Sequence, residues 1–251
     1  MNACLAVALA AALVVAAPRT ATADEIRVFT ARALATVLVE IGSEFERATG
    51  HRLTVVSDLP TGFLRRLQAG ERFDLLISGS DPVDEWIREG RLVANTRTDI
   101  ARSGIGVQVR AGSRKPDIST VAAFTRAVLD AKSIAYLKVG SGIYLDGLFE
   151  RLGIRDALKA KATRPDTDIV SELVAKGEIE LGMTVITQIL TTPGVELVGP
   201  LPHEVQSHVT FAAAVGAGST VKGAASELIT FLKSPRAMAV MKVQGMEPRQ
   251  P

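Results

Sequence analysis

The stretch FDLLISGSDPVDEWIREG, residues 73–90, contains both halves of an α/β unit. It begins with a near-continuous apolar run, which is typical of a parallel strand covered by helices on both faces. Asp81-Pro82 then supplies an N-cap and a proline at the first helical position, and Gly90 ends the helix. The segment therefore predicts a strand that leads through a small polar turn, residues 78–80, into an amphipathic helix.

The same alternation extends along the chain in both directions. Before this stretch, residues 25–31 and 52–58 are predicted strands, and the helix that follows each one ends at a glycine. After it, strands are predicted at 103–113, 133–139, 179–186 and 208–216, and helices at 120–131, 141–152 and 168–176, with two more helices at the C-terminus. Alternating strands and helices predict an α/β fold built around mostly parallel sheets.

The first 23 residues resemble a secretory signal peptide. The apolar run from Cys4 to Ala17 is shorter than the roughly 20 residues that a membrane-spanning helix needs. Residues 21–23 have the A-x-A form of a cleavage site, although the usual positive charges before the apolar run are missing, so retention as an anchor stays open. We expect cleavage after Ala23 and a periplasmic protein. Cys4, the one cysteine, then leaves with this segment, which excludes disulfides and thiolate sites from the mature chain.

Two weakly patterned segments, 95–105 and 199–207, divide the mature chain. If the chain crosses between two lobes there, a hinged cleft results. The predicted boundaries are residues 1–23 for the signal peptide, 24–102 plus 208–251 for lobe 1, 105–200 for lobe 2, and 103–104 and 201–207 for the hinge crossings.

The charge balance favours a small partner. Loss of Arg19 with the leader lowers the formal net charge from +2 to +1, and no run of basic residues with interleaved aromatics indicates nucleic-acid binding. The chain has no G-x-S-x-G, no phosphate-binding P-loop and no H-E-x-x-H, so we predict no catalytic residue, no metal and no cofactor. His203, Glu204 and His208 match no common metal-ligand spacing. Asp166 and Asp168 are predicted as turn and N-cap residues rather than an acid/base pair.

The junctions between strands and helices are the candidate ligand site. Ligands of α/β sheets bind beyond the carboxyl ends of the strands, and the first turn of a helix presents unpaired N–H donors. Gly140 to Gly142 is expected to form one wall of an anion pocket, although Ser141 could simply cap its helix. Arg32 could bind a carboxylate with two parallel hydrogen bonds or point to solvent. The spacing of Tyr144 favours a role in the core.

Four segments together resemble a known family: IRVFTARALATVLVEIGSEFERATG, GFLRRLQAGERFDLLISGSDPVDEWIREGRL, VGSGIYLDGLFERLGI and FLKSPRAMAVMKVQGMEP. In order and spacing they are similar to the molybdate-binding component of bacterial ABC importers, a type II periplasmic binding protein. The resemblance implies a two-lobe Venus-flytrap fold, each lobe a mixed, mostly parallel sheet flanked by helices. It also implies a monomeric receptor that delivers a small anion to an inner-membrane ABC permease, without catalysis.

The family's binding positions transfer only in part. Its first serine falls on Ala33 and its tyrosine on Val185, so two hydroxyl contacts are missing, each worth about 1.5–3 kcal/mol to a charged ligand. A second serine falls on Thr61, and two amide positions fall on Ser141 and near Ile169. The pattern leaves the ligand open between an oxyanion and a small, partly apolar organic acid. The candidate ligand-binding residues are Thr30, Ala31, Arg32, Ala33, Thr61, Gly62, Ser78, Gly79, Ser141, Gly142, Ile143, Ile169, Thr184 and Val185.

Two other functions use the same scaffold. One is an enzyme, although a mature chain without cysteine cannot carry a cofactor attached through a thiol. The other is a ligand sensor fused to a DNA-binding domain, against which the signal peptide and the absence of a helix-turn-helix segment argue.

Overall fold

The N-terminal third of the protein forms the alternating unit that the sequence predicts. The structure is a computed structural model that describes residues 23–249, so the predicted leader lies outside the described residues. Three strands alternate with three helices: β1 (Glu25–Thr30), α1 (Arg32–Thr49), β2 (Arg52–Ser57), α2 (Pro60–Gln68), β3 (Leu75–Gly79) and α3 (Ser80–Arg88). Because β1 pairs in parallel with both β2 and β3, the carboxyl ends of all three strands lie at one edge of the sheet.

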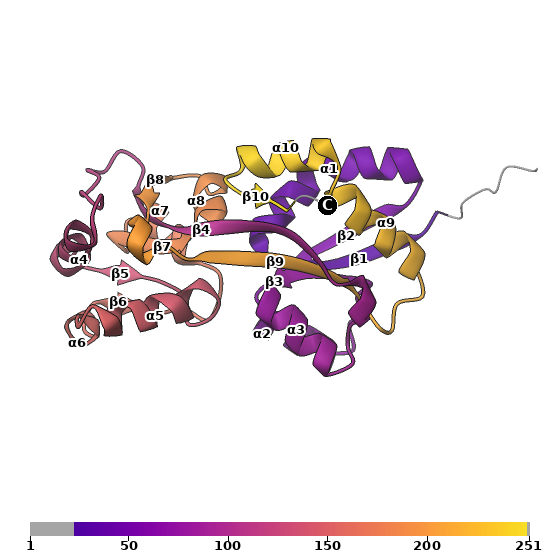
Figure 1. Ribbon diagram of the computed structural model, residues 1–251, viewed down its shortest axis with the longest axis horizontal. Coiled ribbons are helices and arrows are strands. Elements are labelled where there is room, and N and C mark those ends of the chain that lie inside the picture. Colours follow the sequence, from indigo (N-terminus) through magenta and orange to yellow (C-terminus); the bar gives the residue numbers. More distant parts are fainter. Residues whose placement is uncertain (1–22, 250–251) are drawn as a thin grey trace, which may run out of the picture.

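Two long strands connect the two halves of the molecule (Figure 1). They are β4 (Thr98–Arg110) and β9 (His208–Val215), which pair with each other antiparallel. From Ile105 onward β4 changes partners to β7 (Leu181–Val185) and β8 (Val195–Pro200). The resulting order is β2-β1-β3-β9-β4-β7-β5-β6. The predicted hinge crossings at 103–104 and 201–207 fall beside this change of partners, and the lobe boundaries stay a prediction.

The beginning of β4 differs from the prediction, which started this strand at Ser103. The strand begins at Thr98 and runs unbroken through the segment expected to be weakly structured. Charged residues interrupt the apolar pattern that predicts a strand at its beginning. In the structure Asp99 is paired with Arg97, and Arg102 with Glu247. Ionic partners on the surface therefore allow charged side chains within a strand whose other residues, such as Ile100, are buried.

The second half contains shorter elements than expected. They are η1 (Ala94–Thr96), α4 (Val121–Asp130), β5 (Ile134–Ala135), α5 (Ser141–Arg151), α6 (Arg155–Leu158), β6 (Ala162–Thr163), α7 (Val170–Ala175), α8 (Ile186–Thr191), η2 (His203–Val205), α9 (Lys222–Leu232), α10 (Pro235–Val243) and β10 (Glu247–Pro248). The predicted strand at 133–139 reduces to β5. Tyr136 and Lys138 still donate to the carbonyls of Thr163 and Pro165, so the chain remains extended there without a regular ladder.

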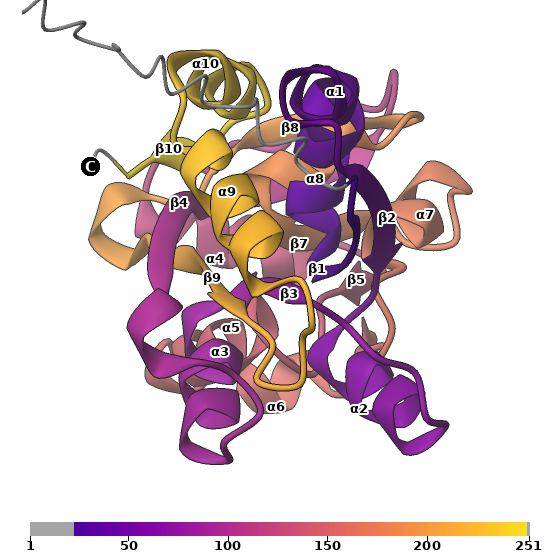
Figure 2. The same ribbon diagram turned by 90° about the vertical axis from the view of Figure 1, so that its right-hand side faces the viewer.

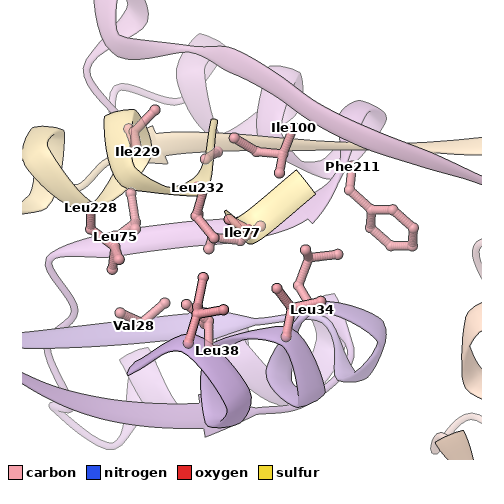
Figure 3. Packing of buried hydrophobic residues seen from close by; sticks show 14 of the residues in the cluster. Val28, Leu34, Leu38, Leu75, Ile77, Ile100, Phe211, Leu228, Ile229 and Leu232 are labelled. Carbon is pink, nitrogen blue, oxygen red and sulfur yellow. The ribbon is translucent and has the colours of Figure 1, made fainter. Parts of the chain in front are cut away.

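Both faces of β3 are buried, which explains its continuous apolar run. Leu75 and Ile77 belong to a core that α1, α9 and α10 cover (Figure 3), whereas Leu76 packs on the opposite face against Phe63 and Trp86. Figure 2 shows these two layers of helices on either side of the strands. Burial of each such side chain stabilises the fold by about 1.5–3 kcal/mol. A separate core, which includes Phe124 and Phe149, lies around β5 and α5.

One glycine of α5 is required by a close backbone contact. A methyl group at Gly142 would lie 1.7 Å from the carbonyl oxygen of Leu137. We therefore expect Gly142→Ala to lower the free energy of unfolding by about 3 kcal/mol, as severe overpacking does. Gly147→Ala in the same helix is the matched control, because its nearest neighbour would lie 3.5 Å away and alanine favours a helix by about 1 kcal/mol. Urea unfolding of both variants measures the difference, and equal midpoints would contradict the expectation.

Candidate functional site

The carboxyl ends of the three parallel strands lie side by side in lobe 1. The N–H of Ala31 donates to the carbonyl of Ile77 at 2.7 Å, and that of Asp58 donates to the carbonyl of Thr30 at 3.3 Å. Thr30 and Ser78 are buried, and the turn at Gly79 is partly exposed. Among the described residues, the backbone N–H groups of Arg32 and Ala33 at the start of α1 have no partner. This edge therefore presents two free donors at the positive end of an 18-residue helix.

Arg32 reaches from this edge to lobe 2. Its Nη1 donates to the carbonyl oxygen of Asp168 at 2.9 Å, and the same nitrogen forms an ion pair with Glu172. In residues 23–249 its Nε and Nη2 have no partner, and the side chain remains 37% exposed. The guanidinium therefore bridges the two lobes with one nitrogen and keeps its other edge unused.

Asp168 is held from the other side by a buried polar chain. Its Oδ1 accepts a hydrogen bond from Nε2 of Gln188 at 2.5 Å, and the Oε1 of Gln188 accepts from the hydroxyl of Thr184 at 3.1 Å. Burial raises the pKa of the Asp168 carboxyl; the bond from Gln188 and the charge of Arg32 oppose this rise, whereas Glu172 and Asp58 add to it. The predicted N-cap role of Asp168 is wrong, because Ile169 occupies the N-cap and no side chain caps α7.

The carboxylate of Asp58 lies at the N-terminus of α2. Oδ1 of Asp58 accepts from the N–H of Leu59 at 2.8 Å, and a methyl group at Gly62 would lie 2.0 Å from that oxygen. The N–H of Gly62 donates to the carbonyl of Leu59, and Thr61 is exposed. Asp58 also pairs with Arg66 at 3.5 Å. A carboxylate of the chain itself therefore lies where the sequence suggested an anion contact.

The wall at Gly140 to Gly142 offers fewer donors than its sequence suggests. The N–H groups of Gly142 and Ile143 donate to the carbonyls of Val139 and Gly140, both at 3.1 Å. Gly140 has a φ of 57°, which favours glycine at this turn. Ser141 keeps its N–H and its hydroxyl without a partner in the described part of the chain. Within the described residues, Gly140 and Ser141 are therefore the members of this segment that keep free donors.

The remaining predicted residues differ in their surroundings. Ile143 and Ile169 are 65% and 40% exposed. Val185 is buried and belongs to the same apolar cluster as Ala33 of lobe 1, so the two positions where the resemblance expected hydroxyls are part of the core. Leu59 of lobe 1 packs against a cluster of lobe 2 that includes Leu137 and Val170. Tyr144 donates its hydroxyl to the carbonyl of Val205 at 2.8 Å and packs against the second core, as its spacing indicates.

Three polar residues of the site were not among the candidates. Asp168 lies in the loop between β6 and α7, where its position before a helix indicated a cap. Glu172 and Gln188 lie within α7 and α8, where no sequence signal separates them from surface residues. The described part of the chain contains no group of three His, Cys, Asp or Glu side chains placed to hold a metal ion. None of the helices described has the length and apolar character to span a membrane.

Residues 26–247 match the family described as bacterial extracellular solute-binding protein. The chain belongs to this family. This solute-binding protein is 30% identical over 215 residues to an aconitate isomerase of a Pseudomonas species, covering 83% of this chain and 82% of the relative. It is 27% identical over 248 residues to the molybdate-binding protein ModA of Escherichia coli (strain K12), covering 94% of each.

A solved structure shows the same fold. The periplasmic molybdate-binding protein of Azotobacter vinelandii aligns with a TM-score of 0.74 at 19% identity, over 90% of this chain and all of that one. The predicted resemblance to molybdate-binding proteins and the two-lobe fold are therefore confirmed. The relatives carry names of both binding proteins and an isomerase, so their names leave the predicted absence of catalysis open.

The environment of Asp168 predicts a pH-dependent stability. Its pKa lies above the ordinary 3.8, so the folded protein binds this proton more tightly than the unfolded chain. The free energy of unfolding should therefore fall as the pH rises from 3.8 through the raised pKa. Asp168→Asn lacks this group and should gain stability relative to the wild type over that range. Asp166→Asn, at an exposed position of the same loop, is the control. Urea unfolding from pH 3 to 8 measures the difference, and a constant difference between wild type and Asp168→Asn would contradict it.

Proposed function

We propose that this protein captures a small di- or tricarboxylic acid between its lobes, with Arg32 as the carboxylate anchor. The observation that carries the proposal is the unused edge of the Arg32 guanidinium, Nε and Nη2, beside the bridge to lobe 2. A guanidinium edge matches a carboxylate with two parallel hydrogen bonds. The free N–H groups of Arg32 and Ala33 and the free donors of Ser141 can serve the same ligand or its second carboxylate.

An organic acid fits this site better than a tetrahedral oxyanion. Ala33 and Val185 provide apolar surface where the molybdate-binding family has hydroxyls, and Leu59 adds apolar surface from lobe 1. Such surface suits a carbon skeleton but leaves the oxygens of an oxyanion without donors. The relative named aconitate isomerase bears the name of a tricarboxylic acid.

Transport is the physiological context of the proposal. The protein would act as a monomeric receptor in the periplasm, after cleavage of the predicted signal peptide, and would deliver its ligand to an inner-membrane ABC permease. Membership of the extracellular solute-binding family supports this role. Closure of the lobes on the ligand would present the loaded form to the permease.

The anchor can be tested by calorimetry with dicarboxylates, tricarboxylates, molybdate and tungstate. We expect the carboxylates to bind and Arg32→Lys to weaken their Kd about 10- to 100-fold, because lysine cannot form the two-bond contact. Arg236→Lys is the matched control, since Arg236 pairs with Glu40 and Glu44 on the surface of lobe 1. Binding of molybdate or tungstate without binding of any carboxylate would refute the proposal.

An isomerase is the second candidate, and the surroundings of Asp168 favour it. A carboxyl with a raised pKa beside a carboxylate anchor is the group that acid/base chemistry on a bound acid requires. The protein incubated with trans-aconitate should then form the cis isomer, which proton NMR distinguishes, and Arg32→Lys should slow the conversion. Tight binding with no conversion would leave the receptor function alone.

A further inference from the structure

We propose that Asp168 is the catalytic acid/base of this site and moves one proton between two carbons of a bound unsaturated polycarboxylate. The inference rests on the isomerase candidate of the proposed function and assigns its chemistry to one side chain. It requires that the carboxyl be fixed, that one oxygen face the ligand, and that the ligand be anchored beside it.

The carboxyl is fixed by a relay with a defined direction. The amide oxygen of Gln188 accepts from the Thr184 hydroxyl, so its NH₂ group must point to Oδ1 of Asp168. Thr184 and Gln188 are 1% and 3% exposed, and they lie on β7 and α8. A buried relay on two regular elements holds the Asp168 carboxyl more precisely than the loop alone could.

The relay also determines which oxygen carries the proton. Oδ1 receives an N–H, and a proton on the same oxygen would compete with that bond. Within the described chain Oδ2 has no hydrogen-bond partner, and it is not among the buried atoms that lack one, so it remains open to solvent or ligand. Oδ2 is therefore the atom that gains and loses the proton.

Arg32 couples this group to the anchored ligand. The guanidinium holds the backbone carbonyl of Asp168 with Nη1, so a carboxylate on its free edge lies next to Asp168. Arg32 comes from the start of α1 and Asp168 from the loop before α7, so the proposal predicts that opening of the lobes would separate the two. Anchor and acid/base thus come together in one conformation of the protein.

The charges that face Asp168 suit a proton carrier. Arg32 favours its ionised form, whereas Glu172 and Asp58 oppose it. Asp58 is partly balanced by Arg66. Burial is the largest cause of the raised pKa of Asp168, so this carboxyl ionises less readily than a surface aspartate and returns a proton more readily.

The proton transfer balances without a further reactant. Ionised Oδ2 takes a proton from the CH₂ carbon that lies between a carboxylate and the C=C bond. The electron pair of the broken C–H bond moves into the allyl unit, and charge develops on the anchored carboxylate, where Arg32 stabilises it. Protonated Oδ2 then returns the proton to the far carbon, the double bond shifts by one position, and Asp168 is ionised again.

Proton exchange with D₂O tests this step separately from binding. The probe is trans-aconitate, with its CH₂ signal followed by proton NMR and its Kd measured by calorimetry on the same samples. We expect the wild type to exchange this signal. Asp168→Asn should keep its affinity and lose exchange by about 10²- to 10⁴-fold, the usual contribution of an acid/base group. Asp166→Asn, two residues earlier and exposed, should exchange at the wild-type rate.

Gln188 is a positioning residue and has its own readout. Its hydrogen bond lowers the pKa of Asp168, so Gln188→Leu should move the lower limb of the pH profile of exchange toward higher pH. A merely structural role would change the rate or the stability without moving that limb. Gln188→Glu is the size-matched companion, since it keeps the shape but removes the NH₂ donor.

Each outcome decides between the two proposals. Binding without exchange in the wild type overturns the role of Asp168 and leaves the receptor function standing. Exchange that persists in Asp168→Asn also overturns it. A wild type that binds none of the polycarboxylates overturns both proposals, and loss of exchange in Asp168→Asn at unchanged Kd supports both.

Discussion

The bridge from Arg32 to Asp168 and Glu172 is the constraint on which the site depends. Nη1 joins residues 136 positions apart in the chain, from the start of α1 in one lobe to the start of α7 in the other. A partly exposed ion pair contributes at most about 1 kcal/mol to stability, so its importance lies in geometry. Arg32 contacts the backbone of Asp168 through Nη1 and leaves the Nε and Nη2 edge of the guanidinium without a partner in the described chain. A ligand bound as proposed would have to be compatible with this one contact.

The charge balance around the bridge restricts what can bind. Arg32 contacts Asp168 and Glu172, and Asp58, which pairs with Arg66, adds a further negative charge near Asp168. Burial raises the pKa of Asp168, and the charges of Glu172 and Asp58 add to this rise. In the proposed function, this excess of negative charge would disfavour a compact dianion and would also provide a group able to exchange protons.

The sequence predicts the layers of the fold well because each layer leaves a local pattern. The apolar run of β3 indicates burial on both faces, and Leu75, Leu76 and Ile77 indeed alternate between two cores. The sequence also indicates the edge of the sheet at which the parallel strands end. It cannot predict the partners across the cleft, since neither the contact of Gln188 with Asp168 nor that of Arg32 with Glu172 follows from periodicity or spacing. Those contacts join segments far apart in the sequence, so no local pattern encodes them.

The chain also uses its backbone donors differently from the expectation. Glycine-rich turns at the mouths of helices suggest free N–H groups, yet those of Gly62, Gly142 and Ile143 donate to carbonyls of their own turns. Gly142 is required by its contact with Leu137, a steric role rather than a binding one. In the proposed site, side chains such as Arg32 would therefore contribute beside the free N–H groups of α1. Because side chains change by single substitutions while the backbone stays the same, one fold can support different ligands and functions.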